Sequence, residues 1–337
     1  MNGMEGKKMQ SMTNIEKLFS VLNDTAEIIA KELNMTYIEA LSETGENIFH
    51  DAILQDDLSE VAEKGLQKKY ESIHLTAFSK EEMRKAYQLA ILKGLKEGAS
   101  PNHQMTPDSI GIFLAYLVSK FVGDQKELSI LDPAVGTGNL LTTVLNSLQN
   151  ETVESAGIDI DDLLVKLAYI SSNLQEHPIQ FFNQDSLEPL LVSPVDAVIC
   201  DLPVGYYPND EGAEKYYLKA AEGHSYAHHL FIEQSMNYTK DGGYLFFIVP
   251  NSIFSSKEAP HLNEYISKEA YIQAFIELPA VLFKDKHHAK SILVLQKQGE
   301  NIVPPKQTML IKLPRMTDKN AMRSIMKQME DWFKVNK

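Results

Sequence analysis

The sequence predicts an α/β protein with a doubly wound, mostly parallel sheet of seven strands, preceded by an N-terminal helical domain. From Ser129 onward, short runs rich in β-branched and aromatic residues alternate with helical stretches. These runs are apolar almost throughout, which is typical of parallel strands covered by helices on both faces. Before residue 100, apolar residues instead recur at spacings of three and four, which predicts amphipathic helices.

The pattern places each element along the chain. Helices are expected at 14–33, 59–73 and 80–98, and the seven strands at 128–134, 155–160, 178–185, 195–201, 243–250, 271–279 and 291–298. A further strand-like run at 307–314 and a last helix at 317–335 complete the chain. We therefore expect four parts: a disordered lead-in (1–14), a helical domain (15–100), the α/β domain (101–300) and a C-terminal strand and helix extension (301–337).

Composition excludes several classes of protein. The 337 residues carry a formal net charge of −14 and one cysteine, Cys200, which excludes a disulfide framework and favours a reducing, cytoplasmic location. No apolar run approaches the roughly 18 residues of a membrane helix. The acidity argues against tight, non-specific binding to nucleic-acid phosphates, which draws on lysine and arginine. The segment Lys284–Lys290 is the best candidate for a local basic lip.

A glycine-containing loop, LDPAVGTGNLL, follows the first expected strand and contains Gly136 and Gly138. Glycines let the backbone come close to a ligand. The dinucleotide fingerprint requires a third glycine where this chain has Leu141. Asp132, at the end of the strand, would repel a pyrophosphate but suits a cation. S-adenosylmethionine carries an ammonium and a sulfonium and no phosphate, so the loop favours it as the cofactor.

Two further acids end the next two strands. Asp159 lies 21 residues beyond Gly138, where an acid can accept hydrogen bonds from both ribose hydroxyls of a nucleotide. Asp185, in NQDSL, stands where it could hold an adenine amino group. The carboxyl ends of parallel strands share one edge of the sheet, so we expect these acids around one ligand.

In this order of motifs the chain resembles class I S-adenosylmethionine-dependent methyltransferases, and more narrowly the adenine-N6 DNA methyltransferases, including the modification subunits of type I restriction systems. The matching segments are HQMTPDSIGIFLAYLV, LDPAVGTGNL, GIDIDD, NQDSL, CDLPVGYYP, GGYLFFIVPNSIF, IELPAVLF and SILVLQK. The resemblance covers roughly residues 100–300 and implies the methyltransferase form of the seven-stranded sheet. Its most discriminating element is the Thr-Pro pair just before the first strand.

The resemblance implies roles for individual residues and no metal. It places the cofactor against Thr106, Pro107, Asp132, Pro133, Ala134, Gly136, Gly138, Asn139, Asp159, Ile160, Asp185 and Ser186. It places Asp201, Leu202 and Pro203 on the family's Asn/Asp-Pro-Pro-aromatic tetrad, in which a side-chain oxygen and a backbone carbonyl accept the two hydrogens of an amine. The tetrad's aromatic residue stacks on a base flipped out of the helix.

This chain departs from the tetrad at two positions. Leu202 replaces the first proline but still offers a carbonyl, and the residue before a proline is held extended. Val204 replaces the stacking aromatic residue. Tyr206 or Tyr207 is the candidate to take its place.

Three functions fit these observations. The first is an adenine-N6 DNA methyltransferase, with DNA as substrate and target recognition supplied by a separate subunit, because only about forty residues follow the last expected strand of the sheet. The second is a glutamine methyltransferase of the release-factor type, which joins a helical domain to this fold and uses the tetrad on an amide. The third is a cofactor-binding regulatory protein whose catalytic loop has lost its function.

Overall fold

The computed structural model describes residues 12–97, 105–123, 125–283 and 288–337. Most of the expected lead-in, the expected boundary near residue 100, and residues 284–287 of the expected basic lip lie outside the described residues. The chain forms two compact units. One comprises Met1–Gln104 with Ile170–His177, and the other comprises Met105–Tyr169 with Pro178–Lys337.

The first unit is helical. Its helices are α1 (Asn14–Leu33), α2 (Tyr37–His50), α3 (Glu60–Tyr70), the short 3-10 helix η1 (Leu75–Ala77) and α4 (Lys80–Glu97). Thr13 and Thr36 each begin a helix with a capping box, completed by Glu16 and Glu39 respectively. The apolar periodicity does not predict α2, because this helix buries Ser42, Thr44, Gly45 and Asn47 beside its apolar residues.

The second unit is the α/β unit. It contains α5 (Asp108–Val122), β1 (Glu127–Asp132), α6 (Asn139–Leu145), β2 (Thr152–Asp159), α7 (Asp162–Leu174), β3 (Ile179–Asn183), β4 (Val195–Asp201), α8 (Asp210–Ala213), α9 (Ala227–Asn237), β5 (Thr239–Pro250), α10 (Ala259–Glu269), β6 (Ala270–Glu277), η2 (Ala280–Leu282), β7 (Lys290–Lys297), β8 (Met309–Lys312) and α11 (Lys319–Asn336). The last residues of α7 cluster with the helical unit.

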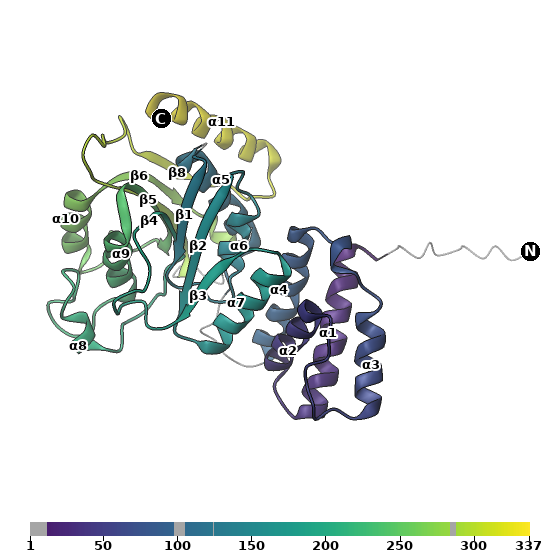
Figure 1. Cartoon of the computed structure of the whole chain (residues 1–337). Helices are drawn as coiled ribbons and strands as arrows, with labels where there is room; N and C mark the ends of the chain where they lie inside the picture. Colours follow the sequence, from purple (N-terminus) through teal and green to yellow (C-terminus); the bar gives the residue numbers. More distant parts are fainter. Residues whose placement is uncertain (1–11, 98–104, 124, 284–287) are drawn as a thin grey trace, which may run out of the picture. The chain divides into compact units, whose positions relative to one another are not determined.

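The strands of the α/β unit form one mixed sheet in the order β3-β2-β1-β4-β5-β7-β6-β8 (Figure 1). β7 pairs antiparallel with both β5 and β6, and the other pairings are parallel. Because β7 alone runs in the opposite direction, its first residue lies at the edge where its neighbours end. Lys290 at the start of β7 pairs with Pro250 at the end of β5.

Apolar side chains are buried on both faces of this sheet, as the continuous apolar strands predict. One core joins residues of the strands to α5, α6 and α11, with Phe246, Ile130 and Leu114 fully buried. The other joins the opposite strand faces to α9 and α10, with Phe247, Leu293 and Leu262 fully buried. The prediction of an α/β fold with a helical N-terminal part is therefore confirmed.

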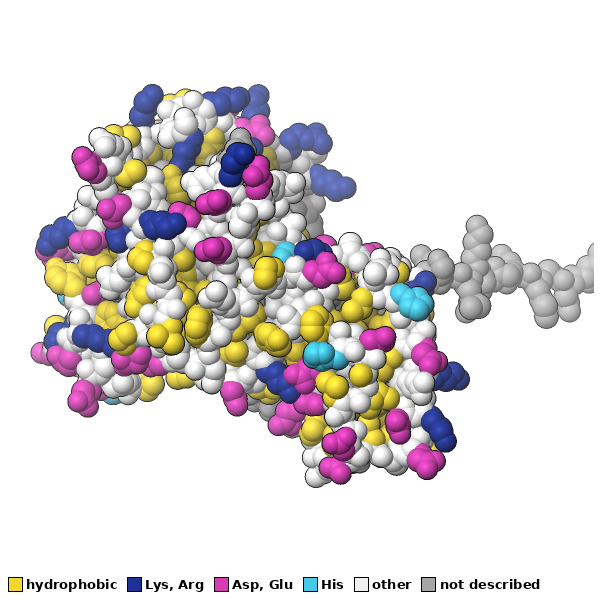
Figure 2. All heavy atoms as spheres, in the orientation of Figure 1, with side chains coloured by type: hydrophobic (Ala, Val, Ile, Leu, Met, Phe, Trp, Pro, Cys, Tyr) yellow, Lys and Arg dark blue, Asp and Glu magenta, His cyan; other side chains and the backbone are white. Residues whose placement is uncertain are grey.

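The predicted strand count was wrong, since the described residues form eight strands in this sheet. The run at 307–314 was expected as a strand of the C-terminal extension and was not counted among the seven, and it forms β8, which pairs in parallel with β6. The pairing covers the edge of β6 and buries Met309 and Ile311 beneath α11. Such a pairing links residues far apart in sequence, so periodicity within the run cannot predict it. The solvent side of α11 and of the loop before it carries many lysines and arginines (Figure 2).

Candidate active site

Three aspartates stand at the carboxyl ends of adjacent parallel strands. Asp132 ends β1, Asp159 ends β2 and Asp201 ends β4. β1 lies between β2 and β4, so Asp132 is the central member of the three. The topology thus places these acids along the edge of the sheet where ligands of this fold class bind.

Asp132 is the most deeply buried of them, with 1% of its surface exposed. Its Oδ1 accepts a hydrogen bond from the backbone N–H of Ala134 at 3.1 Å. Burial, together with the charges of Asp159 and Asp201, raises the pKa of Asp132 to about 8. None of the described lysines, arginines or histidines forms an ion pair with it. A buried carboxyl without a cation is electrostatically suited to a positively charged ligand.

The two glycines of the loop after β1 have different surroundings. Both have positive φ, +52° at Gly136 and +76° at Gly138. A Cβ at Gly138 would lie 3.1–3.2 Å from Ala168 of α7, so this glycine permits close packing of the loop on that helix. A Cβ at Gly136 would meet no atom within 4 Å. Gly136 therefore borders open space, as a loop that faces a ligand should.

Asp159 fixes this loop as well as facing the site. Its Oδ2 accepts the N–H of Gly136 at 2.8 Å, and its Oδ1 accepts the N–H of Asp161 at 3.1 Å. Burial raises the pKa of Asp159. Each carboxylate oxygen has a second lone pair, so these bonds leave acceptor capacity for hydroxyl groups. Ile160, which follows it, is 72% exposed.

Asp185 lies just beyond β3 in a loop fixed by many polar contacts. Its Oδ1 accepts the N–H of Leu187 at 2.9 Å, and its Oδ2 accepts the hydroxyl of Tyr207 at 2.6 Å. The buried hydroxyl of Ser186 donates to the carbonyl of Pro133, in the loop after β1, at 2.5 Å. The loops that follow β1 and β3 are therefore tied directly to each other.

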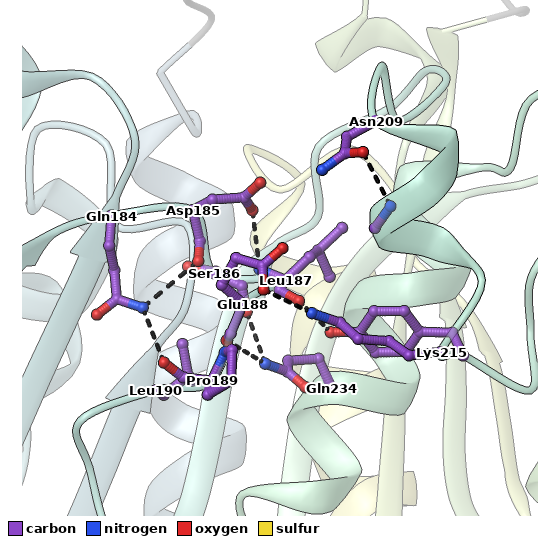
Figure 3. A network of polar contacts seen from close by, with 12 residues as sticks. Gln184, Asp185, Ser186, Leu187, Glu188, Pro189, Leu190, Asn209, Lys215 and Gln234 are labelled. Atoms are coloured by element: carbon purple, nitrogen blue, oxygen red, sulfur yellow. Dashed lines mark hydrogen bonds and ion pairs between the residues drawn. The ribbon is translucent and has the colours of Figure 1, made fainter.

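Figure 3 shows the polar contacts that fix the segment from Gln184 to Leu190. Gln234 of α9 donates from Nε2 to the carbonyls of Ser186 and Glu188, both at 2.8 Å. Lys215 forms an ion pair with Glu188 at 2.7 Å. The hydrogen bonds of Gln234 fix the backbone directly after Asp185, and this backbone in turn holds the Asp185 side chain in place.

The Asp201 side chain contacts two residues from distant segments of the chain. The hydroxyl of Thr106 donates to its Oδ2 at 2.8 Å, and the ammonium of Lys290 lies 2.5 Å from its Oδ1. The ion pair is partly buried, with 25% of the Lys290 side chain and 19% of the Asp201 side chain exposed. Thr106 of the Thr-Pro element, the acidic residue of the tetrad and the first residue of β7 thus meet at one point.

The loop after Asp201 has buried side chains at Leu202 and Tyr207 and exposed ones between them. Leu202 is buried and donates its N–H to the carbonyl of Ile248 at 3.1 Å. Val204 is 60% exposed and Tyr206 is 61% exposed. Tyr207 is buried, and this burial, together with its hydrogen bond to Asp185, raises the pKa of its hydroxyl. Tyr207 therefore has no free ring face for a base in this conformation, whereas Tyr206 has one.

Tyr206 stacks on Tyr226, which the sequence did not single out. The two rings are 5.0 Å apart and 13° from parallel, and an isolated antiparallel bridge joins the two residues. Tyr226 in turn contacts His228 and His229, whose rings are buried. Burial lowers the pKa of His228 to about 3 and that of His229 to about 4, so both are neutral at pH 7.

The other predicted cofactor residues lie on the same loops. Pro107 precedes α5 as its N-cap residue, Pro133 and Ala134 follow β1, and Asn139 is the buried first residue of α6. Pro203 is partly exposed beside buried Leu202. The sequence groups all of these residues and places Lys290 in the candidate basic lip, but it does not predict the contact of Lys290 with Asp201 or the role of Tyr226. The signal for Lys290 is a lysine directly before the apolar run SILVLQ.

These residues fit S-adenosylmethionine. Asp132 supplies an uncompensated buried carboxyl for a cation, Gly136 borders open space, and Asp159 and Asp185 retain acceptor capacity for hydroxyl and amino groups. No group of three or more histidine, cysteine or acidic residues within the described ranges could hold a metal ion. Likewise, none of the described helices is both long and apolar enough to cross a membrane.

Comparison with known proteins defines the class. Residues 79–335 match the family described as N-6 DNA Methylase, and residues 16–95 match the YtxK N-terminal helical domain. The fold and the cofactor loops are those of a class I S-adenosylmethionine-dependent methyltransferase, with S-adenosylmethionine as its cofactor. The first match spans most of the chain, and the chain belongs to the N-6 DNA methylase family.

Two proteins resemble almost the whole chain. The uncharacterized protein YtxK of Bacillus subtilis (strain 168) is 53% identical over 325 residues, which are 96% of this chain and 99% of YtxK. A solved structure from Listeria monocytogenes, provisionally named a class I S-adenosylmethionine-dependent methyltransferase, is 49% identical with a TM-score of 0.89. That match covers 95% of this chain and 99% of the Listeria chain.

Two more distant proteins carry names of different kinds. The methyltransferase subunit of a type I restriction-modification system from Streptococcus thermophilus has a TM-score of 0.64 at 16% identity, covering 95% of this chain and 74% of that one, and shares the fold. A Methanocaldococcus jannaschii protein, provisionally named a protein N5-glutamine methyltransferase, is 26% identical over 192 residues. That match covers 56% of this chain and 92% of the relative.

Proposed function

We propose that this methyltransferase acts on the exocyclic N6 amine of adenine in DNA. The observation that carries the proposal is the 2.8 Å hydrogen bond between Thr106 and Asp201. In adenine methyltransferases, which the chain resembles, the Thr-Pro element lines the methionine end of the cofactor and the tetrad acid receives the amine. The hydrogen bond joins the two elements, so an amine on Asp201 would lie beside the methyl donor.

The chemistry follows from the residues of the loop. An exocyclic amine is a poor nucleophile because its lone pair is delocalised into the ring. Asp201 and the Leu202 carbonyl are the acceptors for its two hydrogens, which moves electron density onto nitrogen. When bound, S-adenosylmethionine supplies the electrophilic methyl group. Pro203 holds Leu202 in an extended conformation that keeps its carbonyl available.

Tyr206 supports a planar ring as the acceptor. It is 61% exposed, it follows the catalytic loop, and its orientation is fixed by the stack on Tyr226. A prearranged aromatic face contributes to base binding by about 1–3 kcal/mol in single-strand binders. We therefore assign to Tyr206 the stacking role that Val204 does not fill.

A glutamine side chain in a protein is the second candidate substrate. The Methanocaldococcus relative favours it, and Val204 would suit a small amide that needs no stacking partner. The Thr-Pro element and the exposed Tyr206 face favour the base. We therefore keep the amide as the alternative acceptor.

Transfer of radiolabelled methyl groups tests the proposal. The purified chain is offered unmethylated duplex DNA, denatured DNA, RNA and a protein extract, with Asp201→Ala as the control. We expect label in N6-methyladenine of DNA, and a loss of about 10²–10³-fold in the control because an oriented electrostatic partner is removed. Label in glutamine of a protein would replace the first proposal with the second. Binding of S-adenosylmethionine with no transfer to any of these would indicate a regulatory protein.

A further inference from the structure

A cluster of positive charge stands out in an otherwise acidic chain. Between Val303 and Gln328 the sequence has six basic residues and a single acid, Asp318, whereas the whole chain carries a net charge of −14. The six are Lys306, Lys312, Arg315, Lys319, Arg323 and Lys327, and we call them the basic surface. They lie on β8, on α11 and on the loops around β8.

These side chains are free to meet a partner. All six are exposed. Lys312 forms an ion pair with Glu277 at 2.7 Å, while the other five have no acidic partner among the described residues. Asp318 supplies only one negative charge among these six cations, and its side chain accepts the N–H groups of Asn320 and Ala321 as the cap of α11. Most of the positive charge therefore remains uncompensated at this surface. Figure 2 shows lysine and arginine side chains gathered on the part of the α/β unit where Figure 1 draws α11.

The stability of α11 does not explain this arrangement. A helix dipole favours acids in the first turn and cations in the last, by about 0.3–1 kcal/mol each. α11 has Lys319 as its first residue, followed by Arg323 and Lys327 at spacings of four, whereas Glu330 and Asp331 stand in its second half. The dipole of α11 does not account for these cations, because Lys319 opposes it in the first turn and Arg323 and Lys327 lie beyond the turn on which it acts. A role in binding accounts for them better than a role in folding.

The basic surface begins at the sheet edge that holds the active site. Lys312 is paired in register with Glu277, the last residue of β6, and Glu277 is paired with Ser291, next to Lys290. Strand β8 is four positions from β4, which ends at Asp201. At about 4.8 Å per strand this is on the order of 20 Å. That distance corresponds to about six base pairs at 3.4 Å each.

We propose that the basic surface binds the phosphate backbone of the nucleic acid whose base enters the active site. This inference rests on the proposed function and adds a second, sequence-independent contact to it. Lysines and arginines without partners gain most from phosphates, because they release the counterions of the nucleic acid. The C-terminal residues then provide affinity for DNA in a chain whose overall charge opposes it, and they provide it without reading bases.

Binding of a fluorescein-labelled 20-base-pair duplex, followed by fluorescence anisotropy from 50 to 200 mM KCl, tests the inference. The variant Arg315→Gln/Lys319→Gln/Arg323→Gln removes three charges that form no ion pair within the described part of the chain. The matched control, Lys31→Gln/Lys64→Gln/Lys68→Gln, removes three exposed lysines of the helical unit. We expect the slope of log K against log[KCl] to fall by about 2 to 3 in the first variant, near 0.9 per phosphate lost. Affinity at 50 mM should fall at least tenfold, with no such change in the control.

Two measurements keep this result separate from folding and from catalysis. Circular dichroism and calorimetric binding of S-adenosylmethionine should match the unmodified chain in both variants. In methyl-transfer assays the basic-surface variant should raise KM for duplex DNA and leave kcat unchanged.

The outcomes are distinguishable. An unchanged slope in the basic-surface variant would overturn the inference, even if DNA is methylated and the proposed function stands. Binding of poly-glutamate as tight as that of the duplex would also overturn it, in favour of an acidic protein partner that approaches through its own complementary surface. Label in protein alone would overturn the proposed function and the part of the inference in which a base of the bound nucleic acid enters the active site, even if the slope falls as expected.

Discussion

The ammonium of Lys290 lies 2.5 Å from Oδ1 of Asp201, on residues 89 positions apart in the chain. Asp201 ends a parallel strand and Lys290 begins an antiparallel one, so the reversal of β7 brings a cation to the edge where the acids gather. With the hydroxyl of Thr106 on Oδ2, both oxygens of Asp201 have a fixed partner. The ammonium also compensates the charge of one of the three carboxyl groups at this edge.

Lys290→Met should lower kcat by about tenfold, equivalent to about 1.4 kcal/mol. The change leaves a partly buried carboxylate without its cation and free to rotate away from the amine. Binding of S-adenosylmethionine, measured by calorimetry, should change less than kcat. Lys290→Arg should recover part of the rate because it restores the charge. Equal kcat in Lys290→Met and the unmodified chain would show that the pair has no role in orienting Asp201.

Tyr206→Ala should raise KM for DNA by about ten- to a hundredfold, the value of one lost base stack. Binding of S-adenosylmethionine should stay unchanged in this variant. Tyr169→Ala, which removes another half-exposed tyrosine of the same unit, is the matched control. If DNA is a substrate and Tyr206→Ala behaves like Tyr169→Ala in steady-state kinetics, Tyr206 does not stack on the base.

Affinity for S-adenosylmethionine should depend on pH through Asp132. Because the pKa of Asp132 is raised to about 8, its carboxyl is mostly protonated in the free protein at pH 7. A cationic ligand favours the ionised form, so binding releases a proton. Affinity should therefore rise up to tenfold per pH unit toward pH 8 and then level off. Calorimetry in buffers of different ionisation enthalpy measures the released proton, and Asp132→Asn should bind more weakly and without this dependence.

Asp132 also determines whether the free energy of unfolding of the ligand-free protein rises or falls with pH. The folded chain holds a proton on Asp132 that the unfolded chain, with an ordinary aspartate pKa of 3.8, releases. The free energy of unfolding should therefore fall as the pH rises from about 4 through 8. Asp159, whose pKa is also raised, acts in the same direction. Thermal melts of the unmodified chain and of Asp132→Asn across this range measure the contribution of Asp132.

Gly138→Ala and Gly136→Ala should separate folding from cofactor binding. A Cβ at residue 138 would lie 3.2 Å from the backbone Cα of Ala168, at a φ of +76°. We expect a loss of stability of about 1–3 kcal/mol there. At residue 136 the added Cβ meets no protein atom, so the cost should be nearer the 1 kcal/mol of a left-handed residue. Calorimetric melting and ligand titration of both variants should show the larger loss of cofactor affinity, relative to stability, at Gly136.

The parts of the site predicted from sequence are those that a strand end determines. In a parallel sheet the carboxyl ends share one edge, so Asp132, Asp159 and Asp201 could be grouped once the strands were recognised. The glycine loop is likewise local, since it follows directly from β1. These features depend only on neighbouring residues and on the fold class.

The unpredicted parts depend on pairing between distant segments. Lys290 reaches the site because β7 is antiparallel, which the apolar run SILVLQ does not reveal. β8 joins the sheet through its register with β6. Tyr206 and Tyr207 are adjacent and look equivalent in sequence, yet one is exposed on Tyr226 and the other is buried on Asp185.

The reactivity of Cys200 with thiol reagents can measure how often the centre of the sheet unfolds locally. The only cysteine of the chain is fully buried in β4, and burial together with neighbouring Asp132 keeps the pKa of its thiol well above the usual range. A thiol reagent can react only when the centre of the sheet separates, so the labelling rate measures how often that happens. Because Cys200 stands directly before Asp201, a ligand that closes the active site should slow labelling, and no engineered probe is needed to observe it.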